Sequence, residues 1–369
     1  MGLSIGIVGL PNVGKSTLFN ALSGASVLAA NYPFATKDPN IGVVPVPDDR
    51  VDRLATLYRP KKTTHASLEF LDIAGLVRGA SKGEGLGNQF LANIREVDAV
   101  AHVMRCFEDP DVVHVDGTVD PLRDKEVVDT ELQLKDLESL EKKRERRLKD
   151  AKAPGKPGEE AKADLAVYDK LKTALEAGRP ARSVPLGDDE KPRARELFLL
   201  TSKPVLYVAN VDESQLTRLD SDSLVATVRK LAEAEGARAV AICSKVEAEI
   251  QQLPAAERAE YLAHIGLEEP GLNRLVREGF ALLGLQSFFT VGEDECRAWS
   301  LNQGEDAVEG AGQIHTDLAR GFVRAEVVCF DDFKRVGSMK EAKTHGVYRL
   351  EGKTYVVKDG DIMHILAST

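Results

Sequence analysis

The stretch Gly9-Leu10-Pro11-Asn12-Val13-Gly14-Lys15-Ser16 decides the fold of this chain. It matches the phosphate-binding loop pattern G-x-x-x-x-G-K-[ST], in which glycines let backbone N–H groups converge on phosphate oxygens. The apolar run Ser4–Val8 before it is typical of a short strand, and Leu18, Ala21 and Leu22 indicate a helix after it. A strand, a glycine-containing turn and a helix in this order predict a nucleoside triphosphate site at the helix N-terminus.

The loop also supplies charge and a metal ligand. Lys15 is expected to neutralise the β- and γ-phosphates, and the Ser16 hydroxyl is expected to reach Mg²⁺. A later strand end, Asp72-Ile73-Ala74-Gly75, offers a carboxylate that can hold Mg²⁺ through water and a glycine N–H for the γ-phosphate. In the segment between them, Thr36 is the candidate second hydroxyl. The predicted metal ligands are therefore Ser16, Thr36 and Asp72.

The segment Asn210-Val211-Asp212-Glu213 predicts which purine is bound. In GTPases of this architecture the pattern N-K-x-D stands here, and its aspartate accepts hydrogen bonds from guanine. Glu213 takes the place of that aspartate, and the longer carboxylate misfits guanine, so the sequence favours ATP. Adenine can be read by backbone groups or by Asn210, and Ser244 fits the final base-side loop. The predicted nucleotide contacts are Asn12, Val13, Gly14, Lys15, Ser16, Thr17, Gly75, Asn210, Val211, Glu213 and Ser244.

The composition fits a soluble α/β protein of two or three domains. Of the 369 residues, 43% are hydrophobic and 29% charged, which excludes wholesale disorder. No run approaches the roughly 20 consecutive apolar residues of a membrane-spanning helix. The start of the chain lacks a basic signal segment, and the four scattered cysteines form no C-x-x-C pair, so we expect a cytoplasmic chain with reduced thiols. The net charge of −10 argues against indiscriminate nucleic-acid binding, and we expect neither a DNA nor a membrane partner.

Apolar runs alternate with helix-length segments on both sides of an interruption at 126–200, which predicts a mostly parallel sheet with helices on both faces. Inside the interruption, two helical patterns flank the breaker-rich stretch Ala153–Gly158 and predict an antiparallel hairpin. Beyond Gly284 the pattern changes to short strands, which indicates a separate α+β module. The expected strands are 4–8, 68–71, 99–104, 204–209, 239–242, 288–290, 324–330 and 354–357.

One end of the hairpin carries a cluster of basic side chains. Two interpretations are open: a solvated helical face on which Glu141, Glu145 and Asp150 partly balance the charge, or an arm that contacts phosphates. The residues of this basic arm are Lys142, Lys143, Arg144, Arg146, Arg147 and Lys149.

Together these motifs resemble the Obg-like ATPase family, called YchF in bacteria, over nearly the whole chain. The resemblance implies an α/β fold: a P-loop G domain with a mostly parallel sheet, an inserted α-helical hairpin and a C-terminal β-grasp (TGS) domain. The implied boundaries are 1–125 and 201–283 for the split G domain, 126–200 for the hairpin and 284–369 for the TGS domain. The segments that carry the resemblance are Gly9–Thr17, Asn31–Phe34 with Thr36, Asp72–Val77, Gly83–Phe90, Asn210–Glu213 and Gly312–Asp317.

The resemblance also implies partners and a mode of base contact. The residue after Asn210 would contact adenine through its backbone, which is Val211 here. The family is linked to ribosomes, which makes the large subunit and its rRNA expected partners and favours Lys142, Lys143, Arg144, Arg146 and Arg147 as RNA contacts. Several relatives carry a redox-sensing cysteine where this chain has Ala35, so that control is not expected here.

Catalysis needs a group that orients water, and the usual glutamine after D-x-x-G is Leu76 here. His114 matches a histidine proposed in the family to replace it, and Asn12 matches the position at which some related enzymes hold a potassium ion. His114 and Lys15 are thus the predicted catalytic residues, with Mg²⁺ and a potassium ion near Asn12 as cofactors.

The sequence therefore predicts a slow Mg²⁺-dependent ATPase whose nucleotide state gates ribosome contact. Two alternatives stay open: a GTPase of ribosome assembly, and an ATP-gated RNA-binding switch that does not hydrolyse ATP.

Overall fold

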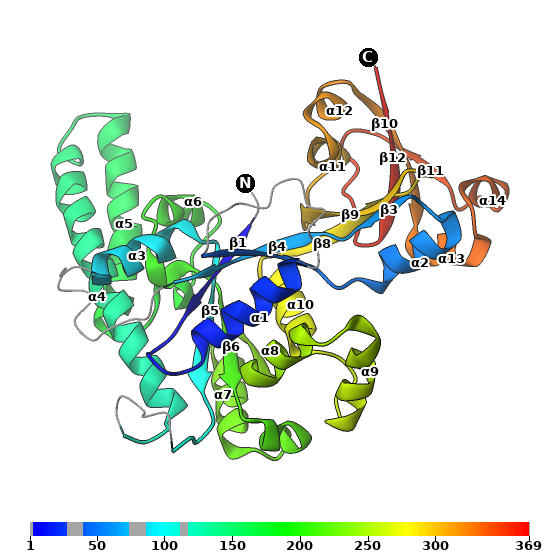
Figure 1. Cartoon of the computed structure of the whole chain (residues 1–369). Helices are drawn as coiled ribbons and strands as arrows, with labels where there is room; N and C mark the ends of the chain where they lie inside the picture. The colour runs from blue at the N-terminus through cyan, green and yellow to red at the C-terminus, as the bar shows by residue number, and fades with distance from the viewer. Residues whose placement is uncertain (1–2, 28–39, 74–85, 111–116, 369) are drawn as a thin grey trace. The chain divides into compact units, whose positions relative to one another are not determined.

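The computed structural model describes residues 3–27, 40–73, 86–110 and 117–368 (Figure 1). The chain forms two compact units. The first contains Leu3–Gly42 and Glu69–Leu275, and the second contains Val43–Leu68 and Val276–Thr369. Residues 43–68 thus group with the C-terminal part of the chain, whereas the expected boundaries put them in the split G domain.

The first unit is built on a six-stranded sheet of order β2-β4-β1-β5-β6-β7. Pairing is parallel between β4 and β1, β1 and β5, β5 and β6, and β6 and β7, which confirms the expected mostly parallel sheet. Every residue of β1, β5 and β6 is buried, because strands covered on both faces need apolar side chains on both. The strands are β1 (Ser4–Val8), β2 (Ile41–Pro45), β4 (Ser67–Asp72), β5 (Ala99–Arg105), β6 (Val205–Asn210) and β7 (Arg238–Ile242).

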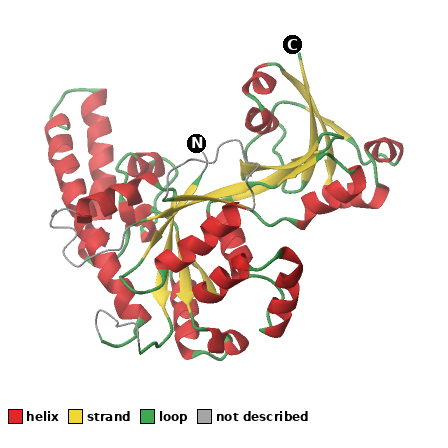
Figure 2. Cartoon of the chain, viewed as in Figure 1, coloured by secondary structure: helices red, strands yellow, loops and turns green. Residues whose placement is uncertain are grey.

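Helices lie beside this sheet (Figure 2). Helix α1 packs against α8, and α7 packs on β6 and β7. Helix α1 begins at Lys15, directly after Gly14, the last glycine of the phosphate-loop pattern. The helices of this unit are α1 (Lys15–Val27), α3 (Leu86–Glu96), α7 (Ser223–Ala234), α8 (Ser244–Gln252) and α9 (Ala255–His264), with the short turn η4 (Glu213–Arg218) after β6. Helix α10 (Gly271–Leu282) begins in this unit and continues into the second.

The interruption of the sheet forms two long helices, α4 (Pro121–Asp150) and α5 (Lys156–Glu176). Helix α4 begins at Pro121, before the interruption predicted at 126–200, because Asp120 caps the N–H groups of Leu122 and Arg123 and Pro121 fits the first helical turn. Residues late in α4 pair with residues early in α5, as in an antiparallel hairpin: Arg147 contacts Asp164 and Arg144 contacts Asp169.

An apolar cluster joins this hairpin to the chain that follows it. Leu140, Tyr168 and Leu171 pack with Leu197 and Leu199. The segments after α5 are short: η2 (Ala181–Ser183), α6 (Glu190–Arg195) and η3 (Leu200–Ser202).

The second unit is built on a sheet of order β11-β10-β12-β8-β9-β3. Its five C-terminal strands have the order of a β-grasp module, with parallel central strands β8 and β12 and antiparallel pairs outside them. β3, from residues 43–68, adds a sixth strand parallel to β9. The strands are β3 (Lys62–Thr64), β8 (Leu285–Thr290), β9 (Glu295–Asn302), β10 (Phe322–Cys329), β11 (Arg349–Glu351) and β12 (Asp361–Ala367); the helices are α2 (Asp49–Tyr58), α11 (Ala307–Ile314), α12 (Thr316–Arg320), α13 (Phe330–Val336) and α14 (Met339–Thr344).

The strand predicted at 354–357 is wrong. Only Val356 makes an isolated bridge, to Asp306, while Val357 is buried in the core of this unit without joining the sheet. In this irregular turn only Val357 is fully buried and Val356 is 51% exposed, and the Tyr355 hydroxyl and the Lys358 N–H both bind Asp361. Within the described residues, no helix has the length and apolar character needed to cross a membrane.

Candidate functional site

The phosphate loop joins β1 to α1 in the conformation that its glycines permit. Asn12 and Gly14 have positive φ angles of 62° and 97°. A Cβ atom at position 14 would collide with the side-chain amide of Asn210. Glycine is therefore required at position 14 both by the backbone angle and by the close approach of Asn210.

Lys15 is held ready at the start of α1. Its side chain is 8% exposed, and its Nζ donates a hydrogen bond to the Leu10 carbonyl oxygen at 2.6 Å. Burial lowers the pKa of Lys15 to about 8, and the nearby Asp72 carboxylate opposes that shift. Burial raises the pKa of Asp72, opposed in turn by Lys15. The loop thus contributes a partly desolvated cation, and the carboxylate at the end of β4 interacts with it electrostatically.

Asn210 connects the phosphate loop to the loop between β7 and α8. Its Nδ2 donates to the Val13 carbonyl oxygen at 2.8 Å, and its Oδ1 accepts from the backbone N–H and the hydroxyl of Ser244, at 3.0 and 2.9 Å. Its buried side chain is therefore occupied by protein groups. Asn210 holds two walls of the site together, and this geometry favours backbone groups over Asn210 for reading adenine.

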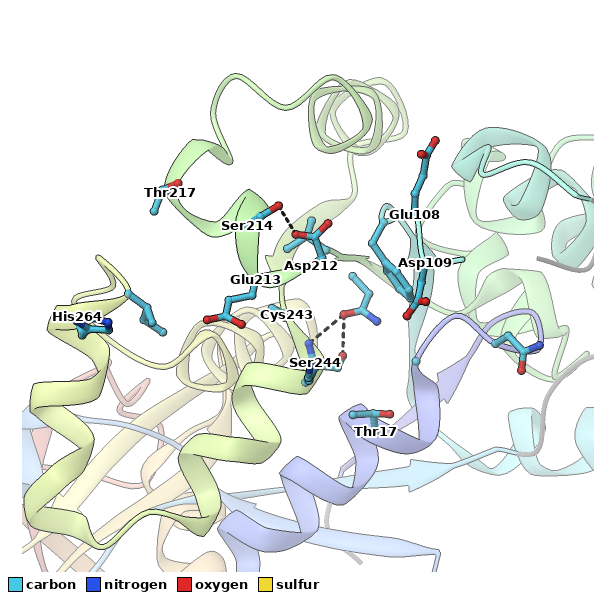
Figure 3. Close-up of a pocket in the computed structure, with 17 residues that line it drawn as sticks. Thr17, Glu108, Asp109, Asp212, Glu213, Ser214, Thr217, Cys243, Ser244 and His264 are labelled. Carbon is cyan, nitrogen blue, oxygen red and sulfur yellow. Dashed lines mark hydrogen bonds between the residues drawn. The ribbon is translucent and has the colours of Figure 1, made fainter. Parts of the chain in front are cut away.

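A cavity of about 910 Å³ opens beside these residues (Figure 3). The figure shows Thr17 from α1, Glu213 from the start of η4 and His264 from the end of α9 around the same space. The structure brings seven predicted nucleotide contacts into its lining: Asn12, Gly14, Thr17, Asn210, Val211, Glu213 and Ser244. Val13, Lys15 and Ser16 lie in the adjoining loop and first helical turn.

The two acids after Val211 have different roles. Asp212 caps η4: it accepts from the Ser214 hydroxyl at 2.6 Å and from the Gln215 N–H at 3.2 Å, while Gln215 accepts from the Asp212 N–H. Glu213 is exposed, lines the cavity and has no hydrogen-bond or ion-pair partner among the described residues. Because the Asp212 carboxylate is engaged in the cap, Glu213 is the carboxylate available to bind a ligand in the cavity.

Sequence reasoning missed the wall formed by Phe107, Glu108 and Asp109. It follows β5, whose carboxyl end lies next to that of β6 in the parallel sheet, and this adjacency is the signal that would have found it. Arg105, at the end of β5, holds this wall in place. Its Nε donates to the Phe107 carbonyl oxygen at 3.1 Å, and its guanidinium lies 4.6 Å from the centre of the Phe107 ring. Thr217, Cys243, Lys245, His264 and Ile265 were also missed.

Comparisons with known proteins place this site in a family. Residues 4–148 match the family model MMR_HSR1, described as a 50S ribosome-binding GTPase, and residues 285–368 match YchF-GTPase_C, described as a protein of unknown function. The chain is 50% identical over 364 residues to the protein named ribosome-binding ATPase YchF of Haemophilus influenzae, covering 99% of each chain. The chain belongs to the YchF family.

Two further relatives agree with this membership. The YchF protein of Bacillus subtilis is 49% identical over 364 residues, covering 99% of each chain. The solved structure of the Schizosaccharomyces pombe YchF GTPase superposes with a TM-score of 0.90 at 36% identity, covering 99% of this chain and 98% of that one. Family membership confirms the resemblance drawn from the motifs and the α/β fold class.

The basic arm is largely engaged within the chain. Lys142 pairs with Glu138, Arg144 with Asp169, and Arg147 with Asp150 and Asp164. Lys143 donates to the carbonyl oxygens of Glu196 and Leu197. Among the described residues, only Arg146 and Lys149 of the arm are exposed without a partner. Much of the charge that the sequence offered for phosphates is therefore used to hold the hairpin together.

Three predicted site residues lie outside the described residues. These are Thr36, Gly75 and His114.

Proposed function

We propose that this YchF-family chain is a slow Mg²⁺-dependent ATPase that binds the ribosome and whose bound nucleotide gates that contact. The observation that carries the proposal is the position of Glu213: a carboxylate without a hydrogen-bond or ion-pair partner faces the cavity where a guanine-reading aspartate stands in related GTPases. The names of the relatives support both parts of the proposal, since they are called ribosome-binding ATPases. A role on the ribosome places the protein in the cytoplasm.

Adenine selection would come from the backbone beside Asn210. Because the Asn210 side chain is occupied by Val13 and Ser244, the groups left at the cavity are the main chain of Val211 and the Glu213 carboxylate. A guanine in the same place would present its N1–H and N2–H to a carboxylate that is one methylene too long for the paired contact. ATP is therefore the preferred substrate, and GTP the weaker one.

The residues present fit a magnesium ion. Hydroxyl and carboxylate oxygens are the ligands that Mg²⁺ prefers. The exposed Ser16 stands at the first turn of α1, and Asp72 ends β4, which pairs with β1 directly before the loop. Ser16, Asp72 and Thr36 would hold Mg²⁺, which when bound would neutralise charge that develops on the β- and γ-phosphates. A potassium ion near Asn12 would help to neutralise the same negative charge.

The chain's own groups would orient the triphosphate. The backbone N–H groups of Val13, Gly14 and Lys15 would donate hydrogen bonds to the phosphate oxygens. The Lys15 ammonium group would give up its hydrogen bond to the Leu10 carbonyl oxygen and bind the β- and γ-phosphates. Leu76 in place of the usual glutamine leaves the attacking water without that side chain, so that turnover is slow and His114 is the proposed substitute.

Calorimetric titration of nucleotide-free protein with ATP and with GTP, each with Mg²⁺, tests the substrate. We expect ATP to bind at least about tenfold more tightly, because one misfitted polar contact costs about 1–3 kcal/mol. Equal or tighter GTP binding would establish the GTPase alternative, which the description of the matching G-domain model favours. Phosphate release measured with and without potassium and ribosomal subunits tests hydrolysis, and its complete absence would leave the non-hydrolysing switch.

A further inference from the structure

Phe198 is the most exposed of the large apolar side chains in the described part of the chain. It is 67% exposed and lies between Leu197 and Leu199, which are 3% and 2% exposed. Its φ angle is +50°, in the left-handed region that glycine and asparagine enter easily and bulky residues rarely do. A phenylalanine at this position is therefore unfavourable for the backbone and for the apolar surface that it leaves in water.

Two contacts from α4 fix the backbone on either side of Phe198. Before it, the Lys143 ammonium group binds the carbonyl oxygens of Glu196 and Leu197 at 2.7 and 3.0 Å. After it, the buried Asp136 carboxylate accepts from the N–H groups of Leu200 and Thr201 at 2.7 and 2.8 Å. Asp136 and Lys143 are seven residues, or about two turns, apart on one helix. The segment is held at both ends, so the ring is presented on a rigid support.

Packing explains the backbone but does not explain the side chain. The left-handed turn lets Leu197 and Leu199 both enter the apolar cluster of the hairpin. Glycine or asparagine at position 198 would allow the same turn at lower cost. The exposed ring therefore contributes little to this fold, and an outside partner is the simplest reason for its presence.

The surroundings of the ring are cationic. Lys143 Nζ lies 5.6 Å from the ring centre. Arg146 is exposed one turn further along α4 and has no partner among the described residues. Arg95 of α3, also exposed, binds the Ser139 hydroxyl one turn before Lys143. Glu196 is the nearby exposed acid of this segment, and Glu138 already pairs with Lys142. An aromatic ring among cations suits an unpaired nucleotide, whose base stacks and whose phosphate is attracted.

We propose that Phe198 stacks on an unpaired base of ribosomal RNA, with Arg95, Lys143 and Arg146 facing the adjacent phosphates. The inference rests on the proposed ribosome contact and assigns that contact to one side chain next to Lys143 of the hairpin. An apolar protein partner fits less well, since the buried neighbours Leu197 and Leu199 leave a single ring instead of a continuous apolar patch.

Phe198→Asn tests the proposal, because asparagine tolerates the left-handed angle. We expect ribosome affinity, measured by co-sedimentation over a range of salt concentrations, to fall about 5- to 100-fold, as for loss of one stacked base. The melting temperature should stay unchanged or rise. Phe198→Trp should retain binding, and Leu134→Asn, which changes an equally apolar side chain on α4 that is 49% exposed, should have no effect.

Salt dependence separates the ring from the charges. Phe198→Asn should leave the salt slope of binding unchanged, whereas Arg146→Ala should reduce it by about one. A photo-crosslinking 4-azidophenylalanine at position 198 should link to rRNA, and a link to a ribosomal protein would overturn the assignment to RNA. Binding by Phe198→Asn equal to that of the unchanged protein would overturn this inference alone. If the unchanged protein does not bind ribosomes, the proposed function fails together with it.

Discussion

Lys15 should make nucleotide binding depend on protons. In the nucleotide-free protein, burial lowers the pKa of Lys15 from 10.5 to about 8, so that near pH 8 the Lys15 side chain is neutral in about half of the molecules. Triphosphate oxygens favour the charged form and raise that pKa again. We therefore expect a net uptake of up to about half a proton on ATP binding at pH 8. Calorimetric titrations in two buffers of different ionisation enthalpy measure this uptake directly.

The same titrations at pH 6.5 provide the control, because Lys15 is then charged in both states and the uptake through it should vanish. The lowered pKa of Lys15 also determines how folding stability changes with pH. The folded nucleotide-free protein binds fewer protons than the unfolded chain between about pH 8 and 10.5, so this group's contribution to stability rises with pH across that window. Heats that are independent of the buffer at pH 8 would show that Lys15 is already fully charged.

Asn210 gives a prediction about how the site is held together. Asn210→Asp keeps the shape of the side chain but replaces the donor to the Val13 carbonyl oxygen by a second acceptor. A buried carboxylate against a carbonyl oxygen should lower the free energy of unfolding by about 2–4 kcal/mol and weaken ATP binding. Denaturant unfolding and ATP titration measure the two effects. Ser244→Ala is the milder comparison, since the Ser244 N–H still reaches Asn210; equal stability of both variants would contradict the role given to Asn210.

At this scale the sequence predicted residue types better than residue contacts. The pattern around Gly14 identified the loop, since only glycine permits its backbone angle. The role of Asn210 could not be seen, because its partners Val13 and Ser244 are far from it in the chain. The pairing of Lys143 with backbone carbonyl oxygens was hidden for the same reason.

The segment after β6 carries the prediction on substrate choice. Val211→Lys combined with Glu213→Asp restores the N-K-x-D pattern, and the shorter carboxylate should accept from guanine N1 and N2. We expect the ratio of GTP to ATP affinity to rise at least about tenfold in competition titrations, because a site built for a paired polar contact discriminates strongly. Glu213→Gln keeps the longer side chain and should not gain GTP binding. An unchanged ratio in the double variant would show that base selection lies elsewhere in the cavity.

Element prediction succeeded where burial was uniform and failed where packing was irregular. The strands β1, β5 and β6 appear in the sequence as apolar runs because both faces are covered. β9 alternates between buried and partly exposed positions and gave no such run. The apolar run at 354–357 suggested a strand, but it lies in a turn from which Val357 enters the core while Val356 stays exposed. An apolar run in the sequence does not by itself predict whether the backbone there forms a strand or a turn.

On the scale of the whole molecule, the grouping of residues 43–68 could not be predicted. The segment lies between two parts of the nucleotide-binding unit in sequence, yet it pairs β3 with β9 and forms an ion pair between Arg50 and Asp359. Partners more than 200 residues apart leave no local pattern, so only the folded chain shows that the second unit is built from two separate stretches.

This arrangement predicts that Arg50 stabilises the second unit. Its guanidinium binds both carboxylate oxygens of Asp359, at 2.7 and 3.1 Å, and lies 5.2 Å from the centre of the Phe289 ring. Arg50→Met keeps much of the apolar stem but removes this pair and also the pair that Arg50 forms with Asp48 at 2.8 Å, while Asp359 keeps the Ser287 N–H. We expect a loss of about 1–2 kcal/mol in the free energy of unfolding of this unit, as for a bidentate, partly buried pair.

Trp299 makes that loss measurable, because it is the single tryptophan of the chain and lies on β9 in the second unit. Its fluorescence during denaturant unfolding should show a lower midpoint for Arg50→Met than for the unchanged protein. Arg320→Met is the matched control: Arg320 belongs to the same unit, is 82% exposed and faces Asp317 at 3.6 Å, so its pair is screened by water and its removal should leave the midpoint unchanged. Equal shifts in both variants would mean that the link from residue 50 to residue 359 contributes no more than an ordinary surface charge.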